Sequence, residues 1–403
     1  MMKKQIVGAL CALIMPLTAL AQFSGDGFYR VQNARSDRYL AFVDNKSKGV
    51  SGTSVDVALL HTWYDFEERV AFSPATICYF IKKSGSGSTF SVDAEGQGYS
   101  LSGVTGGMYL TLRGVSSPAG SYTISGSSSG ATKYIADARL TNSDGEVVAD
   151  KTATAASSAG NYAYWYFIPV DLNDNYLGVK GQVQATADGS YWSTLYTSMA
   201  LRPQSADTKA YVVNRIVGEY AVVHEVSGIV PPATPVLFRC TSAAPVDNKL
   251  MPLRSGGSAS TNYLNGNYYC NDVDDTGNSF PHRNVREFKP STMRVLGVDS
   301  DGRPAFVSST TAPTLVQSVV DGTYVLPANS AYLTVSSSVP DVLHIVTEEE
   351  FIAAGIDDVT FDGTPADASS AARRGTYTLS GQRVATPATK GVYIVNGRKL
   401  VVK

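Results

Sequence analysis

Apolar and polar residues alternate along most of this chain in short segments, and Gly, Pro, Asp and Ser residues separate one segment from the next. Residues 191–196 (YWSTLY) and 209–213 (KAYVV) are typical of these segments. A period of two places successive side chains on opposite faces of a strand, so each segment predicts a strand with one buried face. Helical periodicity hardly occurs beyond the first 21 residues. Together with the many Tyr, Thr and Val residues, the pattern predicts an all-β protein.

The first block, residues 25–171, contains apolar segments at a regular interval. Three of them run through Ile81, Ile124 and Ile168, which lie 43 and then 44 residues apart. A fixed period of this length is typical of repeated structural units. Residues 27–40 (GFYRVQNARSDRYL) resemble the opening strands of ricin-type β-trefoil domains. The resemblance implies a β-trefoil-like domain, in which a barrel buries the apolar segments and the hairpin loops are free to vary.

The second block, residues 175–337, keeps the alternation of apolar and polar positions between Pro, Gly and Asp turns. Its order of segments resembles a β-sandwich module of secreted Bacteroidota proteins, which generally has no assigned activity. We therefore expect a β-sandwich-like domain. Residues 362–374 are rich in Ala, Ser, Asp and Gly and have little to bury, so they predict a flexible or extended linker.

Residues 375–403 (GTYTLSGQRVATPATKGVYIVNGRKLVVK) predict two C-terminal β-hairpins. The second hairpin turns at Asn396-Gly397, a strong hairpin signal. This ending resembles the sorting domain of type IX secretion in Bacteroidota, which implies export and contact with the export machinery. The alternative is a terminal accessory sheet. The alternating residues are Tyr377, Leu379 and Val384 in the first hairpin and Val392, Ile394, Leu400 and Val402 in the second.

The N-terminal residues 1–21 have the features of a secretory signal peptide. Lys3 and Lys4 precede an apolar run, and small residues precede a cleavage position near Ala21. We therefore expect a secreted or outer-surface protein. The formal charge of the whole chain is −2, and it becomes −4 without the two lysines. Such a weak field gives no reason to expect nucleic-acid binding.

Three cysteines follow the predicted signal peptide, namely Cys78, Cys240 and Cys270. An odd number leaves at least one of them unpaired. A disulfide between Cys240 and Cys270 is one interpretation. The other is that Cys78 and Cys240, which lie in apolar segments, are buried as free cysteines and pack as small hydrophobic residues.

Aromatic residues offer the clearest candidate binding site. Trp63, Tyr64 and Asp65 combine flat apolar rings with hydrogen-bonding groups, as sugar rings and peptide partners require. The resemblance to ricin-type lectins implies the same, because there an Asp and an aromatic residue of one lobe hold the sugar. The alternative interpretation is that Trp63 packs in the core.

A metal site is suggested by Asp272, Asp274 and Asp275, whose carboxylates are the hard oxygen ligands that calcium prefers. Their spacing departs from the calcium loop of EF-hands. The alternative is a solvated turn in which Asp and Asn side chains bond to their own backbone. No motif for a cofactor is found.

Catalytic motifs are not recognisable in the sequence. The four histidines are scattered, and the carboxylates form runs instead of facing pairs. Residues 126–130 (GSSSG) fit the G-x-S-x-G pattern of hydrolases, but no helix is predicted after them. The sequence therefore predicts a non-catalytic exported or cell-surface binding protein whose partner is a glycan or an extracellular protein. A structural component of the cell surface and an enzyme with an unrecognised site remain as alternatives.

Overall fold

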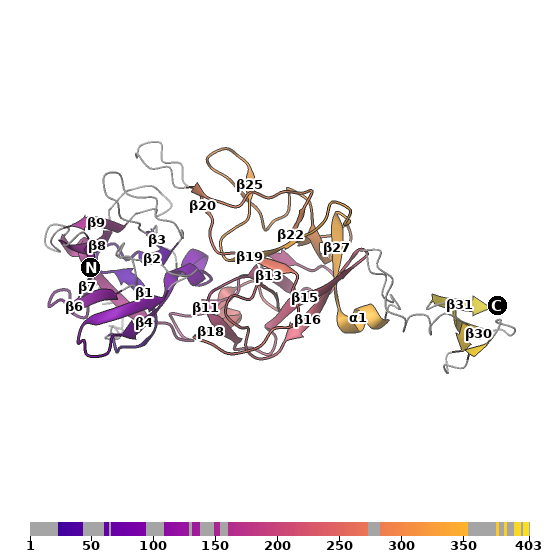
Figure 1. The fold of residues 1–403 in the computed structure, drawn as a ribbon, viewed down its shortest axis with the longest axis horizontal. Helices are drawn as coiled ribbons and strands as arrows, with labels where there is room; N and C mark the ends of the chain where they lie inside the picture. Colours follow the sequence, from indigo (N-terminus) through magenta and orange to yellow (C-terminus); the bar gives the residue numbers. More distant parts are fainter. Residues whose placement is uncertain are drawn as a thin grey trace, which may run out of the picture.

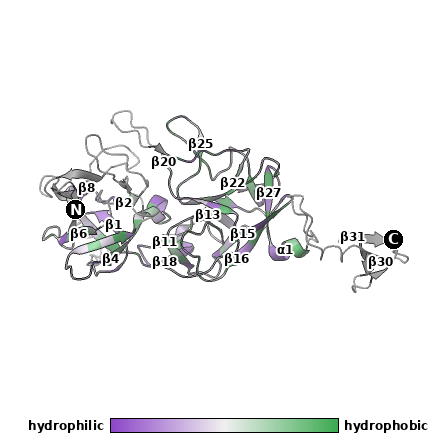
Figure 2. Ribbon diagram, viewed as in Figure 1, coloured by the Kyte–Doolittle hydropathy of each residue, from purple (hydrophilic) through white to green (hydrophobic). Residues whose placement is uncertain are grey.

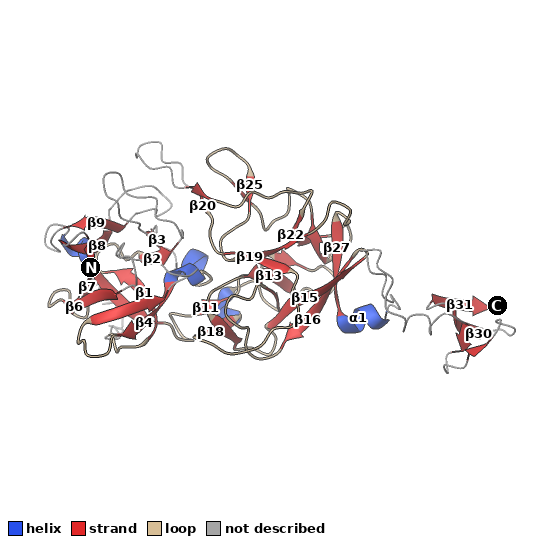
Figure 3. Ribbon diagram, in the orientation of Figure 1, coloured by secondary structure: helices blue, strands red, loops and turns tan. Residues whose placement is uncertain are grey.

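Strands make up almost all of the regular structure in this computed structural model (Figure 3). The all-β prediction is therefore confirmed. The one α-helix of the described residues, α1 (Glu348–Ala353), has six residues, and none of the described helices could cross a bilayer. The predicted signal peptide (1–21) and linker (362–374) lie outside the described residues. The structure describes residues 23–42, 60–63, 66–93, 109–128, 131–137, 149–153, 160–272, 283–353, 376–378, 383–384, 391–395 and 398–402.

Six antiparallel strands of the first block close into a ring, called the barrel here (Figure 1). β1 pairs with β4 and β10, β10 pairs with β7, and the pairs β4–β5, β5–β6 and β6–β7 complete the ring. The hairpins β2–β3 and β8–β9 extend from β1 and β7. The strands are β1 (Gly27–Asn33), β2 (Tyr39–Phe42), β3 (Leu60–Trp63), β4 (Ile77–Lys82), β5 (Thr89–Asp93), β6 (Tyr109–Gly114), β7 (Tyr122–Ser128), β8 (Ala131–Asp137), β9 (Ala149–Ala153) and β10 (Tyr164–Pro169).

The barrel core comes from alternate positions of the ring strands, as the sequence pattern requires. Tyr29 and Val31 of β1 pack with Phe80 of β4 and Phe167 of β10, and all four are almost completely buried. Trp165 is also buried, and its Nε1 donates a 2.9 Å hydrogen bond to the backbone oxygen of Ile135. The aromatic rings therefore fill the barrel, and Trp165 holds the β8–β9 hairpin against it.

A β-trefoil would carry one hairpin in each of three units. The hairpins β2–β3 and β8–β9 occupy two of these places, and the third would lie in residues 94–108, outside the described residues. The trefoil-like assignment therefore stays a prediction. The period of Ile81, Ile124 and Ile168 does not mark equivalent strands. Strands related by a threefold repeat would lie two places apart in a six-stranded ring, but β7 and β10, which carry Ile124 and Ile168, are adjacent in it.

The second body is formed by the described residues of 171–353 and contains two main sheets. One is a ten-stranded sheet that curls around a core, and the other is a three-stranded sheet, β11–β18–β14. β27 lies beyond residue 337 and joins the large sheet by pairing with β16 and β23. The large sheet runs, in order, β12 (Val183–Gln184), β13 (Tyr191–Leu195), β17 (Val236–Cys240), β15 (Lys209–Val217), β16 (Tyr220–Val226), β27 (Val342–Thr347), β23 (Pro304–Val307), β22 (Met293–Val298), β26 (Ser330–Thr334) and β19 (Leu264–Asn267). The small sheet consists of β11 (Leu177–Gly178), β18 (Lys249–Leu253) and β14 (Ala200–Pro203).

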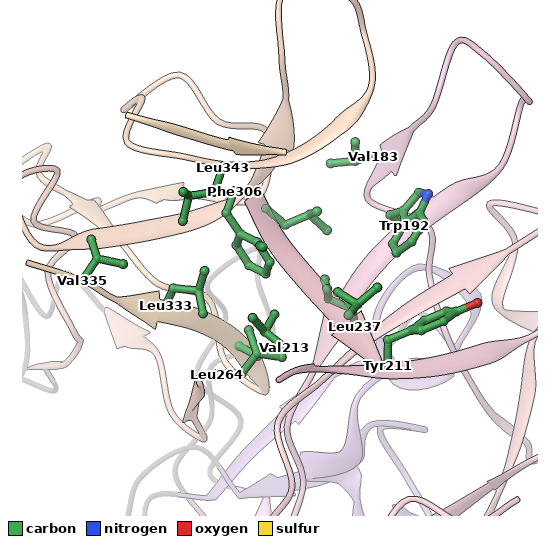
Figure 4. Packing of buried hydrophobic residues seen from close by; sticks show 14 of the residues in the cluster. Val183, Trp192, Tyr211, Val213, Leu237, Leu264, Phe306, Leu333, Val335 and Leu343 are labelled. Carbon is green, nitrogen blue, oxygen red and sulfur yellow. The ribbon is translucent and has the colours of Figure 1, made fainter. Parts of the chain in front are cut away.

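The core of the second body gathers side chains from both halves of the large sheet (Figure 4). Leu237 of β17 and Val213 of β15 pack with Phe306 of β23 and Leu333 of β26. Hydrophobic and hydrophilic residues are interspersed along the strands, as alternation predicts (Figure 2). The large sheet thus forms a half-barrel around one core. Two short pairs lie beside it, β20 (Asn271–Asp272) with β21 (Arg283–Asn284) and β24 (Val316–Gln317) with β25 (Tyr324–Val325).

The two predicted C-terminal hairpins are confirmed, and they join into one sheet because β28 pairs with β30. In the second hairpin, Val392 pairs with Val401 and Ile394 with Lys399. The sheet runs, in order, β29 (Arg383–Val384), β28 (Thr376–Thr378), β30 (Gly391–Val395) and β31 (Arg398–Val402).

Among the described residues, Cys78, Cys240 and Cys270 form no disulfide. Cys78 and Cys240 are 1% exposed and pack in the two cores, whereas Cys270 is half-buried. The interpretation of a Cys240–Cys270 disulfide is therefore wrong. Burial of a thiol among apolar side chains disfavours its thiolate, and the pKa of Cys240 is raised to about 12.

Candidate ligand-binding cleft

A cleft of about 380 Å³ lies where the barrel meets the second body. Its first wall is the segment 69–73 of the barrel, and its second wall consists of residues 178–182 and β13. Residues 327–329 and Val316 complete the rim. Small-molecule sites typically have volumes of about 300–1,000 Å³ and occur preferentially at domain interfaces. The size and position of this cleft fit such a site.

The first wall is a pair of short helical turns between β3 and β4. The turn η1 (Phe66–Val70) is closed by a 2.7 Å hydrogen bond from the Ala71 amide to the Phe66 oxygen, and η2 (Pro74–Thr76) follows it. Val70 and Ala71 are fully buried. Because these two residues anchor the turn, the next side chain, Phe72, stays half-exposed at the cleft.

The side chain of Arg30 ties this wall to the second body. From β1, its guanidinium donates to the backbone oxygen of Val70 (3.0 Å) and to Thr76 Oγ1 (2.9 Å). It also donates to Asn175 Oδ1 (2.8 Å) and to the backbone oxygens of Asn175 (3.2 Å) and Tyr176 (2.8 Å). One residue thus fixes the segments that lead into both walls.

Arg30 is 0% exposed, and no described carboxylate lies within ion-pair distance of it. Desolvation by burial lowers the pKa of Arg30 from 12.5 to about 9. The ring of Phe66 lies 5.2 Å from the guanidinium carbon and adds a cation–π contact. A buried cation of this kind is tolerated because neutral oxygens satisfy its donors.

The second wall is positioned by close backbone contacts. The Gly178 amide donates a 2.8 Å hydrogen bond to the Ala71 oxygen of the first wall. A Cβ at Gly178 would stand 2.1 Å from the Pro245 oxygen, so only glycine fits here. The Val179 amide bonds the Asn248 oxygen at 3.0 Å. Lys180 follows at once, and its Nζ lies 4.7 Å from the centre of the Phe72 ring on the opposite wall.

Several polar groups of the cleft have unused hydrogen-bonding capacity. Ser73 and Ser193 are 9% and 4% exposed, and their hydroxyls make no hydrogen bond in the described part of the chain. Gln182 Oε1 accepts a 3.2 Å bond from the Thr194 amide, which leaves its NH₂ group available. These groups can donate hydrogen bonds to, or accept them from, a polar ligand in the cleft.

The described lining of the cleft carries cationic and neutral groups. Of the described residues that line the cleft, Arg69 and Lys180 are the ionisable ones, and both are cations. General acid–base catalysis most often uses His, Glu or Asp. None of these three residue types occurs in the described lining beside the Ser193 hydroxyl.

A second, smaller cavity of about 290 Å³ lies beside β17, and its two cations have carboxylate partners. Arg239 donates to Asp188 Oδ2 at 2.6 Å, and Lys209 Nζ lies 3.1 Å from Glu225 Oε2. Hydrogen bonds from Ser190 and from Arg239 lower the pKa of Asp188. A ligand would have to compete with these internal pairs, so this cavity is the weaker candidate.

The predicted ligand residues lie just before the first wall in the sequence. Trp63 ends β3, where its backbone pairs with Tyr39 of β2. The side chain of Trp63 and the whole of Tyr64 and Asp65 lie outside the described residues. Their role in binding therefore stays a prediction.

Only one of the three predicted metal ligands lies within the described residues. Asp272 lies on β20, where its backbone pairs with Arg283, and Asp274 and Asp275 lie outside the described residues. Among the side chains that the structure describes, no group of three or more His, Cys, Asp or Glu could hold a metal ion. The metal site also stays a prediction. The first three residues of the G-x-S-x-G segment, 126–128, lie on β7, which pairs with β8, and residues 129 and 130 lie outside the described residues.

Arg30 and the cleft residues Phe72, Lys180 and Ser193 were not identified from the sequence. Phe72 follows Val70 and Ala71 in a run that is typical of core, and Lys180 stands in no motif.

Comparison with known proteins adds no assignment. No protein-family model matches this chain, and neither the curated proteins nor the solved structures contain a significant match.

Proposed function

We propose that this chain is an exported, non-catalytic binding protein that holds a glycan segment in the cleft between the barrel and the second body. The observation that carries the proposal is the combination of the half-exposed Phe72 ring with the unbonded hydroxyls of Ser73 and Ser193. A sugar ring presents apolar C–H groups and several hydroxyls, so it needs an apolar surface and polar partners together.

The proposal that the protein lies outside the cell is based on its N-terminal and C-terminal segments. Residues 1–21 have the composition of a signal peptide, and residues 375–403 resemble a type IX sorting domain. The sheet formed by β28 to β31 is consistent with a separate terminal element of that kind. The Trp63–Asp65 segment leads directly into the first wall and supports the same ligand class.

The test is a glycan array probed with the protein that begins at Gln22, followed by calorimetric titration of the glycans that bind. Phe72→Ala should weaken binding about tenfold, equal to about 1.4 kcal/mol. Ser193→Ala should weaken it several-fold, since one hydrogen bond contributes about 0.5–1.5 kcal/mol. Thr241→Ala, at the second cavity, is the control and should bind normally. An array without ligands, or binding that both cleft variants retain, would contradict the proposal.

Assembly of copies through strand addition is a second candidate. β31 pairs with β30 on one side, and none of the described strands occupies its other side. An open strand edge is a template for pairing with another chain. Sedimentation of the protein over a concentration series tests self-pairing: growth of larger species would support it, and a monomer at all concentrations would exclude it.

A further inference from the structure

Lys180, which lines the cleft, differs from the cations of the second cavity in its partners. Lys209 and Arg239, at the second cavity, have carboxylate partners 3.1 and 2.6 Å away. Lys180 is exposed, and the described residues place no carboxylate within ion-pair distance of its Nζ. Its Nζ lies 4.7 Å from the centre of the Phe72 ring. The charge of Lys180 is therefore available at the cleft.

The described lining of the cleft contains no carboxylate that could neutralise Lys180. Neighbouring Glu67 and Glu68 are exposed and do not line the cleft. The cleft thus combines the charge of Lys180 with neutral hydrogen-bonding groups, the complement of a ligand that carries both hydroxyls and negative charge.

We infer that the glycan held in this cleft is acidic, with a carboxylate or sulfate group placed against Lys180. The inference rests on the proposed function and names its ligand class. The Lys180 ammonium acts as a compact point charge with three hydrogen-bond donors, so it can bind either kind of acidic group. The Phe72 ring and the Ser193 hydroxyl would contact the uncharged part of the sugar.

The experiment compares matched glycans on one array, with each uronate-containing oligosaccharide beside its carboxyl-reduced form and each sulfated one beside its desulfated form. Preference for the acidic member of the pairs is the expected result, and the two kinds of pair distinguish carboxylate from sulfate. Equal or better binding of the neutral members would overturn the acidic ligand while leaving the glycan cleft standing. No binding at all would overturn the proposed function itself.

Charge variants then test whether Lys180 is responsible. Lys180→Gln should weaken binding of the acidic glycan at least tenfold at low salt and leave binding of its neutral counterpart unchanged. Lys180→Arg should keep most of the affinity, because it keeps the charge. The affinity of the unaltered protein should fall as salt is raised, and that of Lys180→Gln should fall less. Lys209→Gln is the matched control and should bind normally. An unchanged Lys180→Gln affinity would overturn the assignment.

Discussion

The guanidinium of Arg30, on the first strand of the barrel, donates a 2.8 Å hydrogen bond to the backbone oxygen of Tyr176 in the second body. The same group bonds the Val70 oxygen at 3.0 Å, two residues before Phe72. Together with the Gly178–Ala71 backbone hydrogen bond, this one buried side chain therefore sets the distance between the walls of the cleft.

Arg30→Met should lower the free energy of unfolding by roughly 2–4 kcal/mol, because it leaves several buried oxygens without donors. Chemical denaturation at neutral pH measures this loss. Glycan binding should fall as well, since both walls lose their common anchor. Ligand titration of the folded variant measures that effect.

Arg294→Met is the matched control for Arg30. Arg294 is also buried and bonds the backbone oxygens of Pro340 and Val339, both at 2.8 Å, but it lies entirely within the second body. Its replacement should cost comparable stability without weakening ligand binding. Equal binding losses in the two variants would show that instability, not wall position, governs affinity.

Gly178→Ala should destabilise the protein strongly, because the new Cβ would stand 2.1 Å from the Pro245 oxygen and the backbone would have to move. We expect a loss of about 2 kcal/mol or more, measured as a lower melting temperature. Gly114→Ala is the comparison, since a Cβ there meets its nearest atom, in the Tyr122 ring, at 3.8 Å. A Gly178→Ala protein as stable as Gly114→Ala would refute this close approach.

The acid sensitivity of the second body should depend on Glu348. Its Oε2 lies 2.9 Å from His224 Nδ1, and this hydrogen bond, helped by one from Asn214, holds the pKa of Glu348 below its usual 4.5. A lowered folded-state pKa contributes stability above the unfolded-state value, and that contribution is lost as pH falls through the folded-state value. Glu348→Gln should therefore be less stable near neutral pH.

The difference between Glu348→Gln and the unaltered protein should shrink as the pH drops below about 4.5, measured as melting temperature across a pH series. Glu349→Gln is the control, because Glu349 is the exposed neighbour on α1. A stability gap of constant size down to low pH would contradict the role of ionised Glu348.

Thiol titration should separate the three cysteines. Burial raises the pKa values of Cys78 and Cys240, so neither should react with a thiol reagent in the native protein. Cys270 is half-buried and should be the one that reacts. All three should react after unfolding without a reductant. A single reactive thiol in the unfolded protein would instead reveal a disulfide.

Local patterns predicted the strands, whereas the cleft depends on contacts between distant segments. The C-terminal hairpins followed from alternation and the Asn396-Gly397 turn, which act over a few residues. The cleft joins segment 69–73 to residues 178–195 and 327–329, and no period in the sequence connects them. Alternation indicates which residues share a strand face but not what covers the face.

The residues around Arg30 show which part of the contact between the barrel and the second body could have been predicted from the sequence. Tyr29 and Val31 point into the barrel, so alternation places Arg30 and Phe28 on its outer face. Phe28 packs there with the apolar cluster of the second body. An apolar residue on the outside of a barrel strand is a signal that another element covers it. The identity of that element, and the donors that Arg30 would satisfy, required the tertiary structure.

The four strands at the C-terminal end pair only with one another among the described residues. Such a unit should be transplantable: fused behind an unrelated carrier, residues 375–403 should refold without help from the rest of the chain. Any address that this small sheet encodes would then travel with it to the new cargo.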